Sequence, residues 1–498
     1  MPSSSRRTSA RRVAARRSSR PASSSRREGE DAVRNGEISY WMQSRGLASG
    51  RRDGARAELN GDVDADVCIV GAGFTGLWAA YHLLLRDRAL RIVILEREIA
   101  GYGASGRNAG WLSPLVPGNR RVFSRSAGSR EAGVRLQRRM LEAVDEVLGI
   151  VERESIDAAA IRSGNVVVAR NPAAMQRLRD RLAADRAWGY TVAEGAELSA
   201  AELAERIRVR GAVGGLFYPT VGRIDPGGLV RGLAALVERR GAVIHEHSEV
   251  TGIASGVART ASGSVRARVV LRCTEGYSVD LADDPRRIIP INSSIIITEP
   301  LPQQVWDEIG WNRRELFSDA AHVFSYSQRT DDGRILLGGR GNPYRFGSGT
   351  GGDGRVDRAT VEALTSRLHA MFPATAAHGI AHAWSGVLGV TRDWCASVRF
   401  DPSSGLGHAQ GYAGHGVTSA YLAAKTLAER VLGERDGDAA LPWAGRQTRN
   451  WEPEPIRWAG VHAMYRMFAF ADWDEERRGA TRTSIFARLG SRLAGLHE

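Results

Sequence analysis

The chain has 498 residues, of which 43% are hydrophobic and 25% charged, so it is long enough for two or three domains and a large core. Its formal net charge is +13, but residues 1–60 hold fourteen arginines against six acidic residues, so the excess is largely local and a nucleic-acid partner is not expected. No apolar run is long enough for a transmembrane segment, and the cysteines at 68, 273 and 395 lack metal-type or redox-type spacing, so we expect a cytoplasmic protein without a metal.

Residues 1–36 are dominated by serine and arginine. Too few apolar side chains occur there to offset the entropy cost of ordering, so we predict a disordered tail. No apolar core of a signal peptide follows its paired arginines. A transit peptide, an arm that touches RNA or a membrane, and a start codon placed too far upstream remain open alternatives.

The strongest motif begins after a short apolar run, residues 67–70, which is typical of a buried parallel strand. G-A-G-F-T-G follows at once, and a helix-forming Ala/Leu-rich segment comes next. Gly71 permits a tight turn, Gly73 lets the backbone approach a pyrophosphate, and Gly76 lets the helix pack closely on the strand. The free N–H groups at the helix start suit a phosphate.

A second apolar strand, residues 92–95, ends in Glu96, whose carboxylate can accept hydrogen bonds from a ribose hydroxyl. Strand, glycine triplet, helix, strand and acid in this register predict a dinucleotide site. The acid favours FAD or NAD over NADP, because it would repel the 2′-phosphate of NADP.

A second small-residue loop, residues 101–111, distinguishes FAD from NAD. A nicotinamide enzyme has no need of such a loop directly after the ribose acid, whereas the longer FAD runs on into the protein. The loop contains A-S-G-R-N-A-G and resembles the G-x-x-A/S-S-G-R-N-x-G segment of the D-amino-acid oxidase-like (DAO) FAD-dependent oxidoreductases. The resemblance is closest to the branch that contains gamma-glutamylputrescine oxidase.

Downstream segments alternate between the nucleotide domain and an inserted domain. Apolar spacing predicts a long amphipathic helix at 130–153, and a strand at 166–169 follows. The chain then returns to the nucleotide domain over 212–280, where the resemblance places Val250 beside the adenine. The T-E-G-Y run at 274–277 is similar to a family element near the pyrophosphate.

Residues 287–345 alternate like an antiparallel sheet, which we expect to form one wall of a substrate cavity. Tyr326 is a candidate substrate contact on that wall, although an aromatic residue in a strand is more often part of a core.

G-Y-A-G-H-G at 411–416 matches a family motif and leads into an apolar helix at 420–432. The positive end of a helix dipole suits the anionic N1–C2=O edge of reduced flavin. We therefore expect His415 at the flavin edge, with a purely structural histidine as the alternative. A Trp-rich extension follows, with amphipathic helices expected at 456–468 and 485–496.

The resemblance implies FAD-dependent oxidation of a C–N bond: hydride passes to flavin N5, and the imine is hydrolysed. Relatives that oxidise glycine and D-amino acids carry a carboxylate-binding arginine where this chain has Leu388. Loss of that charge-assisted contact favours a small-molecule amine, such as a γ-glutamylated polyamine, over a simple amino acid. No cysteine stands where sarcosine oxidase-like relatives attach flavin, so we expect non-covalent FAD. The catalytic residues are unknown.

We predict an α/β (α+β) fold, with a Rossmann-type FAD-binding domain that is discontinuous in sequence and an inserted antiparallel-sheet substrate domain. The expected parts are a tail (1–36), FAD-binding parts (37–160, 213–282 and 380–435), substrate-domain parts (161–212 and 283–379) and a C-terminal extension (436–498). The expected cofactor contacts are Gly71, Ala72, Gly73, Thr75, Gly76, Glu96, Arg97, Ala104, Ser105, Arg107, Asn108, Ala109, Gly110, Val250, Gly386, Gly414, His415, Gly416, Val417 and Thr418.

Two other functions remain open. One is an amino-acid or hydroxy-acid oxidase or dehydrogenase, and the other is a tRNA-modifying flavin oxidase. Oxygen or another electron acceptor would reoxidise the flavin, and the sequence does not reveal the oligomeric state.

Overall fold

The structure is a computed structural model that describes residues 33–47, 56–281 and 285–494. Most of the expected tail, residues 1–36, lies outside these residues. Its last part does not: β1 (Arg34–Asn35) pairs with a strand of the larger sheet. Strand pairing therefore includes residues slightly before the boundary drawn from composition, because backbone pairing does not require apolar side chains.

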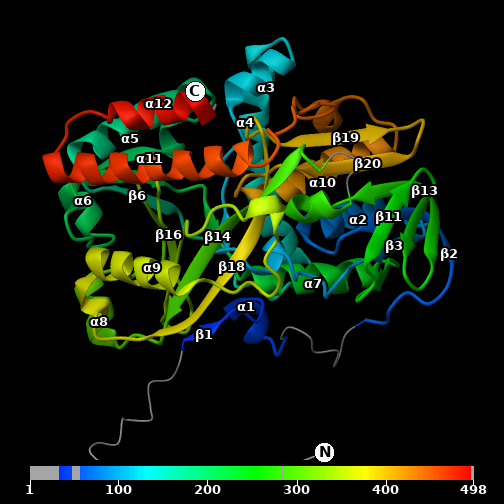
Figure 1. The fold of residues 1–498 in the computed structure, drawn as a ribbon, viewed down its shortest axis with the longest axis horizontal. Helices are drawn as coiled ribbons and strands as arrows, with labels where there is room; N and C mark the ends of the chain where they lie inside the picture. Colours follow the sequence, from blue (N-terminus) through cyan, green and yellow to red (C-terminus); the bar gives the residue numbers. More distant parts are fainter. Residues whose placement is uncertain (1–32, 48–55, 282–284, 495–498) are drawn as a thin grey trace, which may run out of the picture. The chain divides into compact units, whose positions relative to one another are not determined.

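The first sheet has a parallel core, as a Rossmann-type domain requires (Figure 1). Its strands run in the order β10-β3-β2-β13, an antiparallel pair follows β13, and β20 with β19 joins at β13. The bounds are β2 (Val63–Val70), β3 (Ile92–Leu95), β10 (Val243–His245), β11 (Val250–Ala254), β12 (Val257–Thr260), β13 (Ser264–Arg272), β19 (Ser397–Asp401) and β20 (Leu406–Gln410).

Helices from distant parts of the sequence pack together beside this sheet. α2 contacts both α7 and α10, and α10 also contacts α4, so helices from four separate parts of the sequence pack against one another. Leu77, Leu229 and Leu422 are fully buried in the shared core. The bounds are α1 (Tyr40–Gln43), α2 (Phe74–Arg86), α3 (Arg120–Ser126), α4 (Arg130–Arg153), α7 (Pro226–Arg239) and α10 (Gly416–Val431).

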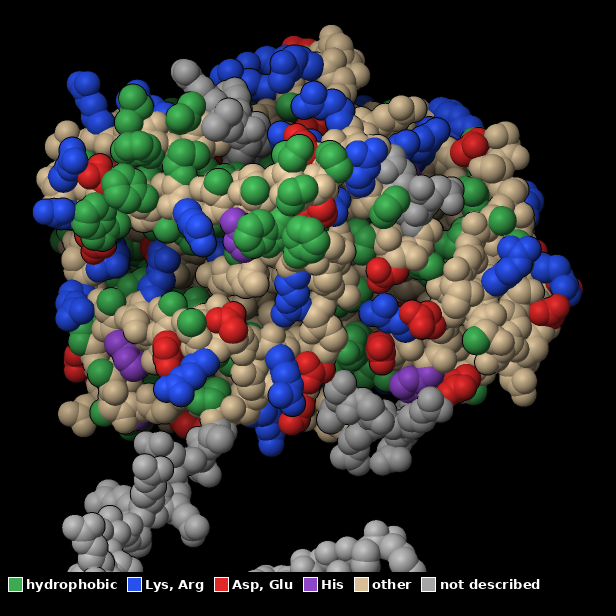
Figure 2. All heavy atoms as spheres, viewed as in Figure 1, with side chains coloured by type: hydrophobic (Ala, Val, Ile, Leu, Met, Phe, Trp, Pro, Cys, Tyr) green, Lys and Arg blue, Asp and Glu red, His purple; other side chains and the backbone are tan. Residues whose placement is uncertain are grey.

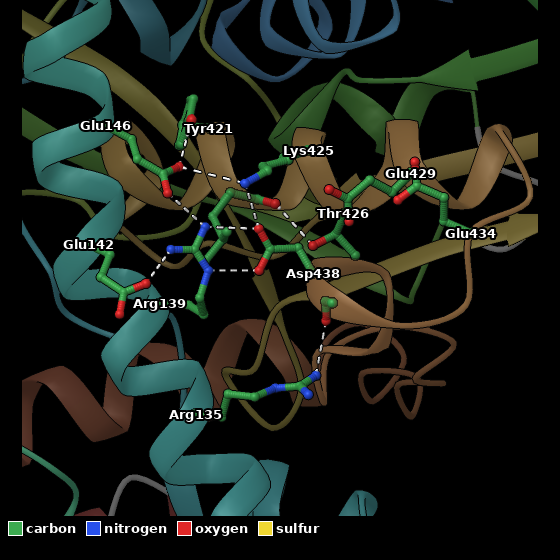
Figure 3. Close-up of polar contacts among 12 residues, drawn as sticks. Arg135, Arg139, Glu142, Glu146, Tyr421, Lys425, Thr426, Glu429, Glu434 and Asp438 are labelled. Atoms are coloured by element: carbon green, nitrogen blue, oxygen red, sulfur yellow. Dashed lines mark hydrogen bonds and ion pairs between the residues drawn. The ribbon is translucent and has the colours of Figure 1, made fainter. Parts of the chain in front are cut away.

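A polar cluster fixes α10 against α4 (Figure 3). Arg139 of α4 forms two hydrogen bonds with Asp438, at 2.7 and 2.8 Å, and Lys425 of α10 lies 2.8 Å from the same carboxylate. The hydroxyl of Tyr421 donates to Glu146 at 2.7 Å. Asp438 is nearly buried, in η6 (Gly437–Ala440), so these charges satisfy one another and hold the helix in place.

The second sheet has nine strands in the order β1-β18-β14-β17-β16-β15-β6-β8-β7. Most neighbours are antiparallel, as predicted for the substrate domain, but β1–β18 and β15–β6 are parallel. The bounds are β6 (Asn165–Ala169), β7 (Ala196–Ser199), β8 (Gly214–Tyr218), β14 (Ile288–Thr298), β15 (Leu316–Asp319), β16 (Tyr326–Arg329), β17 (Ile335–Gly339) and β18 (Ile380–Thr391).

Two expected domain limits differ from the sheets. β18 falls in the range assigned to the FAD-binding domain, 380–435, and β8 falls in 213–282, yet both strands belong to the nine-stranded sheet. We assigned β8 and β18 to the nucleotide domain because of sequence motifs near the ends of these strands. The sheet to which a strand belongs is decided instead by its pairing with distant residues.

Smaller elements complete the fold. A three-stranded sheet, β4-β9-β5, comprises β4 (Trp111–Leu112), β9 (Gly222–Arg223) and β5 (Ile161–Arg162). The remaining helices are α5 (Pro172–Ala187), α6 (Ala200–Ala204), α8 (Gln303–Ile309), α9 (Arg358–Met371), α11 (Ile456–Arg478) and α12 (Ile485–Ala494). The short 3-10 helices are η1 (Ala104–Gly106), η2 (Val192–Glu194), η3 (Glu275–Asp280), η4 (Phe346–Ser348) and η5 (Pro373–Thr375).

The C-terminal extension forms the two predicted helices, and α11 is longer than expected. α11 crosses in front of the nine-stranded sheet (Figure 1), where Val461 packs with Ile289 and Ile291 of β14. Asp472 of α11 accepts hydrogen bonds from the backbone N–H groups of His322 and Val323, at 2.7 and 2.9 Å. The extension is thus attached to the loop that leads into β16.

Candidate active site

A cavity of about 450 Å³ lies where the predicted segments meet. Its walls come from the end of β2 and the start of α2, from the loop around η1, from β11, from η3, and from the segments around β18 and the start of α10. The cavity is therefore built by all three returns of the chain.

The glycine triplet shapes the first wall. Gly71 has φ +103°, and a Cβ there would meet the carbonyl of Cys273. Gly73 is the N-cap residue of α2 and has no side chain to cap the helix. The N–H of Phe74 is bonded to the Ser105 hydroxyl, and the N–H groups that follow it in the first turn have no intrahelical partner and suit a ligand. A Cβ at Gly76 would overlap the carbonyl oxygen of Gly71, so helix and strand can approach this closely only with glycine. This wall fits a pyrophosphate.

Glu96 lies at the end of β3 and lines the cavity, as predicted. Its carboxylate already accepts hydrogen bonds from the N–H groups of Ala72, at 2.8 Å, and Glu98, at 3.0 Å. Burial raises the pKa of Glu96 above its ordinary value, although these N–H groups oppose that effect. The two bonds hold the acid beside the turn and leave lone pairs available to a ribose.

The loop around η1 divides into ligand-facing and structural residues. Ser105 and Asn108 line the cavity, and the Ser105 hydroxyl accepts from the N–H of Phe74 at 2.8 Å. Arg107 does not line it: its buried guanidinium donates to the carbonyls of Tyr102, at 2.7 Å, and Ser385, at 3.2 Å. Arg107, the cation of this loop, therefore connects η1 to β18 through hydrogen bonds.

The start of α10 faces the cavity from the other side. Gly414, Gly416 and Val417 line it, and the N-cap residue His415 makes no side-chain capping bond. Burial, with smaller contributions from Arg181 and Arg340, lowers the pKa of His415 to about 4, so the imidazole is neutral at pH 7. The positive charge offered here is that of the helix end itself.

Glu275 is a cavity residue that the sequence did not single out. It has φ +46°, and its carboxylate accepts from the N–H groups of Gly411, at 2.9 Å, and Tyr412, at 3.0 Å. Burial raises its pKa to about 7, against the effect of these bonds. The sequence signal that could have identified Glu275 was an acidic residue within the T-E-G-Y run. The burial of this residue depends on distant segments, so the signal alone did not reveal it.

The substrate candidates lie on the nine-stranded sheet, Tyr326 on β16 and Leu388 on β18, with β17 and β14 between them. The hydroxyls of Tyr326 and Ser293 are 2.6 Å apart. Ser293 pairs with Gly386, and Ile291 with Leu388, so the Ser293 and Leu388 side chains leave the same face of the sheet. Leu388 lines the cavity, and Tyr326 does not. The Tyr326 hydroxyl is buried, and this burial raises its pKa.

The expected cofactor residues separate into two groups. Those that line the cavity are Gly71, Gly73, Thr75, Glu96, Arg97, Ala104, Ser105, Asn108, Val250, Gly414, Gly416 and Val417. Those that do not line it are Ala72, Gly76, Arg107, Ala109, Gly110, Gly386, His415 and Thr418. Cavity residues outside the prediction include Tyr277 and Tyr412; the latter's hydroxyl lies 3.1 Å from that of Thr75.

Within the described residues, no group of three or more His, Cys, Asp or Glu side chains is placed to hold a metal ion. The three cysteines are free and buried. In the same part of the chain, none of the helices combines the length and the apolar stretch needed to cross a bilayer.

Comparison with known proteins agrees with this site. The profile of the FAD dependent oxidoreductase (DAO) family matches residues 66–430. Gamma-glutamylputrescine oxidoreductase of Escherichia coli (strain K12) is 30% identical over 390 residues, which cover 76% of this chain and 87% of that protein. Glycine oxidase of Geobacillus kaustophilus (strain HTA426) is 24% identical over 375 residues, which cover 74% and 92%.

The fold is also that of solved relatives. The crystal structure of glycine oxidase from Geobacillus kaustophilus superimposes with a TM-score of 0.63 at 20% identity, covering 77% of this chain and 99% of that one. L-proline dehydrogenase from P. horikoshii gives 0.61 at 18% identity, covering 75% and 94%. The chain is therefore an enzyme that belongs to the FAD-dependent oxidoreductase (DAO) family.

Proposed function

We propose that the protein oxidises a C–N bond of a small-molecule amine, with a specificity similar to that of gamma-glutamylputrescine oxidoreductase. The observation that carries this proposal is that Leu388, an apolar residue, lies in the cavity wall. The motif resemblance implies that amino-acid-oxidising relatives carry their carboxylate-binding arginine at this position. The 30% identity to the Escherichia coli enzyme over most of both chains supports the same class of substrate.

The apolar wall explains the preference for an amine. A Cβ at Gly414 would approach the Leu388 side chain at 3.6 Å, so Leu388 stands directly beside the start of α10. A carboxylate placed there would lose water without gaining a charged partner, which is costly. An uncharged amine bearing methylene groups suits the same surface, and the neutral form is the one that gives up hydride.

The walls of the cavity fit FAD. We assign the pyrophosphate to Gly71, Gly73 and the start of α2, the ribose to Glu96, and the adenine side to Val250. The flavin edge falls to Gly414, Gly416 and Val417 at the start of α10. When bound, FAD supplies the hydride acceptor, while the protein orients the amine and excludes water.

We propose that FAD is held without a covalent bond. Cys395 is buried against Gly118 and lies outside the cavity wall, and its sulfur accepts from the N–H of Asn119 at 3.3 Å. Cys273 does line the cavity, but burial raises the pKa of its thiol to about 12, so it is a poor nucleophile at neutral pH. We also propose that the enzyme is cytoplasmic and that oxygen or another electron acceptor reoxidises its flavin.

The test is a substrate panel with the purified flavoprotein. γ-Glutamylputrescine, putrescine and N-alkyl amines form one arm, and glycine, D-alanine and sarcosine form the other. Turnover is followed both by peroxide and by reduction of an artificial carrier, so that an oxidase and a dehydrogenase are both detected. Turnover confined to the amine arm supports the proposal, and turnover confined to the amino-acid arm refutes it.

A further inference from the structure

The outer face of α11 and α12 exposes a contiguous group of apolar side chains. Phe470 and Trp473 on α11 are 45% and 51% exposed, and Phe486 on α12 is 44% exposed. The Phe470 ring lies 5.5 Å from that of Trp473 and 5.2 Å from that of Phe486, so the two helices share one patch. Ile485 and Leu489 extend it, at 67% and 51% exposure.

The patch is ordered rather than frayed, because the opposite faces of both helices are buried. Phe468, Ala471 and Ala487 form a small core between them, and a Cβ at Gly490 would meet Met467 and Phe468. The exposed apolar side chains therefore lie outside this small core between α11 and α12. Contiguous exposed apolar surface of this kind marks an interaction site.

Arginines border the patch. Arg466 is four residues before Phe470 and Arg477 four after Trp473, so both lie on the exposed side of α11. Arg482 and Arg488 are also exposed, and in the described part of the chain none of these four forms an ion pair. Figure 2 shows the hydrophobic side chains over α11 and α12 with Lys and Arg side chains around them.

Within the described residues the four arginines are outside ion pairs, and the guanidinium of Arg477 lies over the Trp473 ring, 5.2 Å from its centroid. Apolar and aromatic side chains bordered by such arginines are the pattern of a protein surface that lies on a membrane. The apolar groups enter the boundary of the acyl chains while the guanidinium groups meet anionic headgroups. A second copy of this chain fits less well, because a two-fold contact would bring the arginine border of one patch against that of the other.

We propose that α11 and α12 form a docking surface for an anionic lipid bilayer. The enzyme would lie on the membrane through Phe470, Trp473, Phe486 and Leu489, without crossing it. This surface is separate from the FAD cavity and carries no residue of its wall.

The test is co-sedimentation of the full-length flavoprotein with vesicles of phosphatidylcholine alone or mixed with phosphatidylglycerol. We expect binding to the mixed vesicles that weakens with salt, and a loss of about tenfold or more in Phe470→Ser/Trp473→Ser/Leu489→Ser. The matched control, Val192→Ser/Phe346→Ser, removes apolar side chains that are 76% and 63% exposed elsewhere, and it should bind like the unaltered protein.

Two further measurements keep the proposal falsifiable if the triple variant folds poorly. Emission assigned to Trp473, from the difference between the protein and Trp473→Phe, should shift to the blue and be quenched by brominated lipid. Arg477→Gln/Arg482→Gln/Arg488→Gln should bind mixed vesicles more weakly and with less salt dependence. Absence of vesicle binding overturns the proposal, as does binding that persists in the patch variants, which would assign it to the arginine-rich residues 1–32. A patch-dependent dimer that ignores vesicles also overturns it.

Discussion

The carboxylate of Glu275 accepts a hydrogen bond from the backbone N–H of Tyr412 at 3.0 Å. This bond joins η3, at the end of the nucleotide sheet, to the G-Y-A-G-H-G segment that precedes α10. It is one of the contacts that assemble the cavity from distant parts of the chain, and it places an ionisable group in the cavity wall.

Glu275 should make stability depend on pH. Its pKa is raised from an ordinary value of 4.5 to about 7, so the folded protein binds more protons than the unfolded chain between these values. Stability therefore falls as pH rises from about 4.5 to about 7, by up to about 3 kcal/mol. Denaturant unfolding of Glu275→Gln should lack this decline.

Glu249→Gln is the matched control for that experiment, because Glu249 lines the same cavity with a side chain that is 62% exposed. It should retain the pH dependence of the unaltered protein. An unchanged pH profile in Glu275→Gln would contradict the assigned burial and pKa of Glu275.

Gly76→Ala should greatly reduce FAD content. A Cβ at this position would overlap the carbonyl oxygen of Gly71 and force the start of α2 away from β2. We expect a loss of about 2 kcal/mol or more in stability, as for other overpacked buried sites, and weaker FAD binding by calorimetry. Gly149→Ala in α4 meets nothing within 4 Å and should be neutral or stabilising by up to about 1 kcal/mol.

Leu388→Arg should shift the substrate preference towards carboxylates. The new guanidinium would offer glycine a charge-assisted contact on the cavity wall and would remove apolar contact from an amine. We expect kcat/KM for the preferred amine to fall by about tenfold or more. Leu388→Met retains the apolar surface and should leave the amine preference intact. An amine preference unchanged by the arginine would show that Leu388 lies away from the substrate.

Glu475→Gln should loosen α11. The buried carboxylate of Glu475 is held by His322 at 3.0 Å and Arg177 at 2.6 Å. Although burial opposes the effect, these partners lower its pKa to about 2. Its stabilisation is thus present above the unfolded value of 4.5 and is lost as pH falls through about 2.

At pH 7 we expect Glu475→Gln to cost about 2 kcal/mol in urea unfolding, with the difference from the unaltered protein vanishing in acid. Glu476→Gln on the same helix removes an ion pair from a side chain that is 66% exposed, and it should cost less than about 0.5 kcal/mol. If both variants lost the same free energy of unfolding, the buried contacts of Glu475 would not stabilise the protein more than the exposed ion pair of Glu476.

Acid precipitation should leave the protein colourless and release all of the FAD into the supernatant. Neither Cys273, whose thiol pKa is raised to about 12, nor Cys395, which lies outside the cavity wall, is suited to a covalent link. Yellow colour in the washed precipitate would contradict non-covalent binding.

The sequence predicted the local elements of this fold well. α4 has the predicted bounds, 130–153, because its apolar residues repeat at helical spacing over many turns. Gly71, Gly73 and Glu96 line the cavity, because turn, helix start and strand end lie within a short stretch of chain, whereas Gly76 lies outside the cavity wall.

Long-range contacts were not predictable in the same way. Arg107 was expected at the cofactor but bonds to Ser385, whose position depends on how β18 pairs with β14. Glu275 was overlooked because its burial is produced by Gly411 and Tyr412, more than a hundred residues away. A single sequence contains no signal for such pairings beyond the strand patterns themselves.

Anaerobic flavin bleaching tests the central claim most directly. The purified yellow protein is mixed, without oxygen, with γ-glutamylputrescine and, separately, with glycine. We predict loss of the oxidised flavin absorbance with the amine but not with glycine, and recovery of colour when an electron acceptor is admitted. Bleaching by glycine alone, or a purified protein that retains no flavin, would contradict the account.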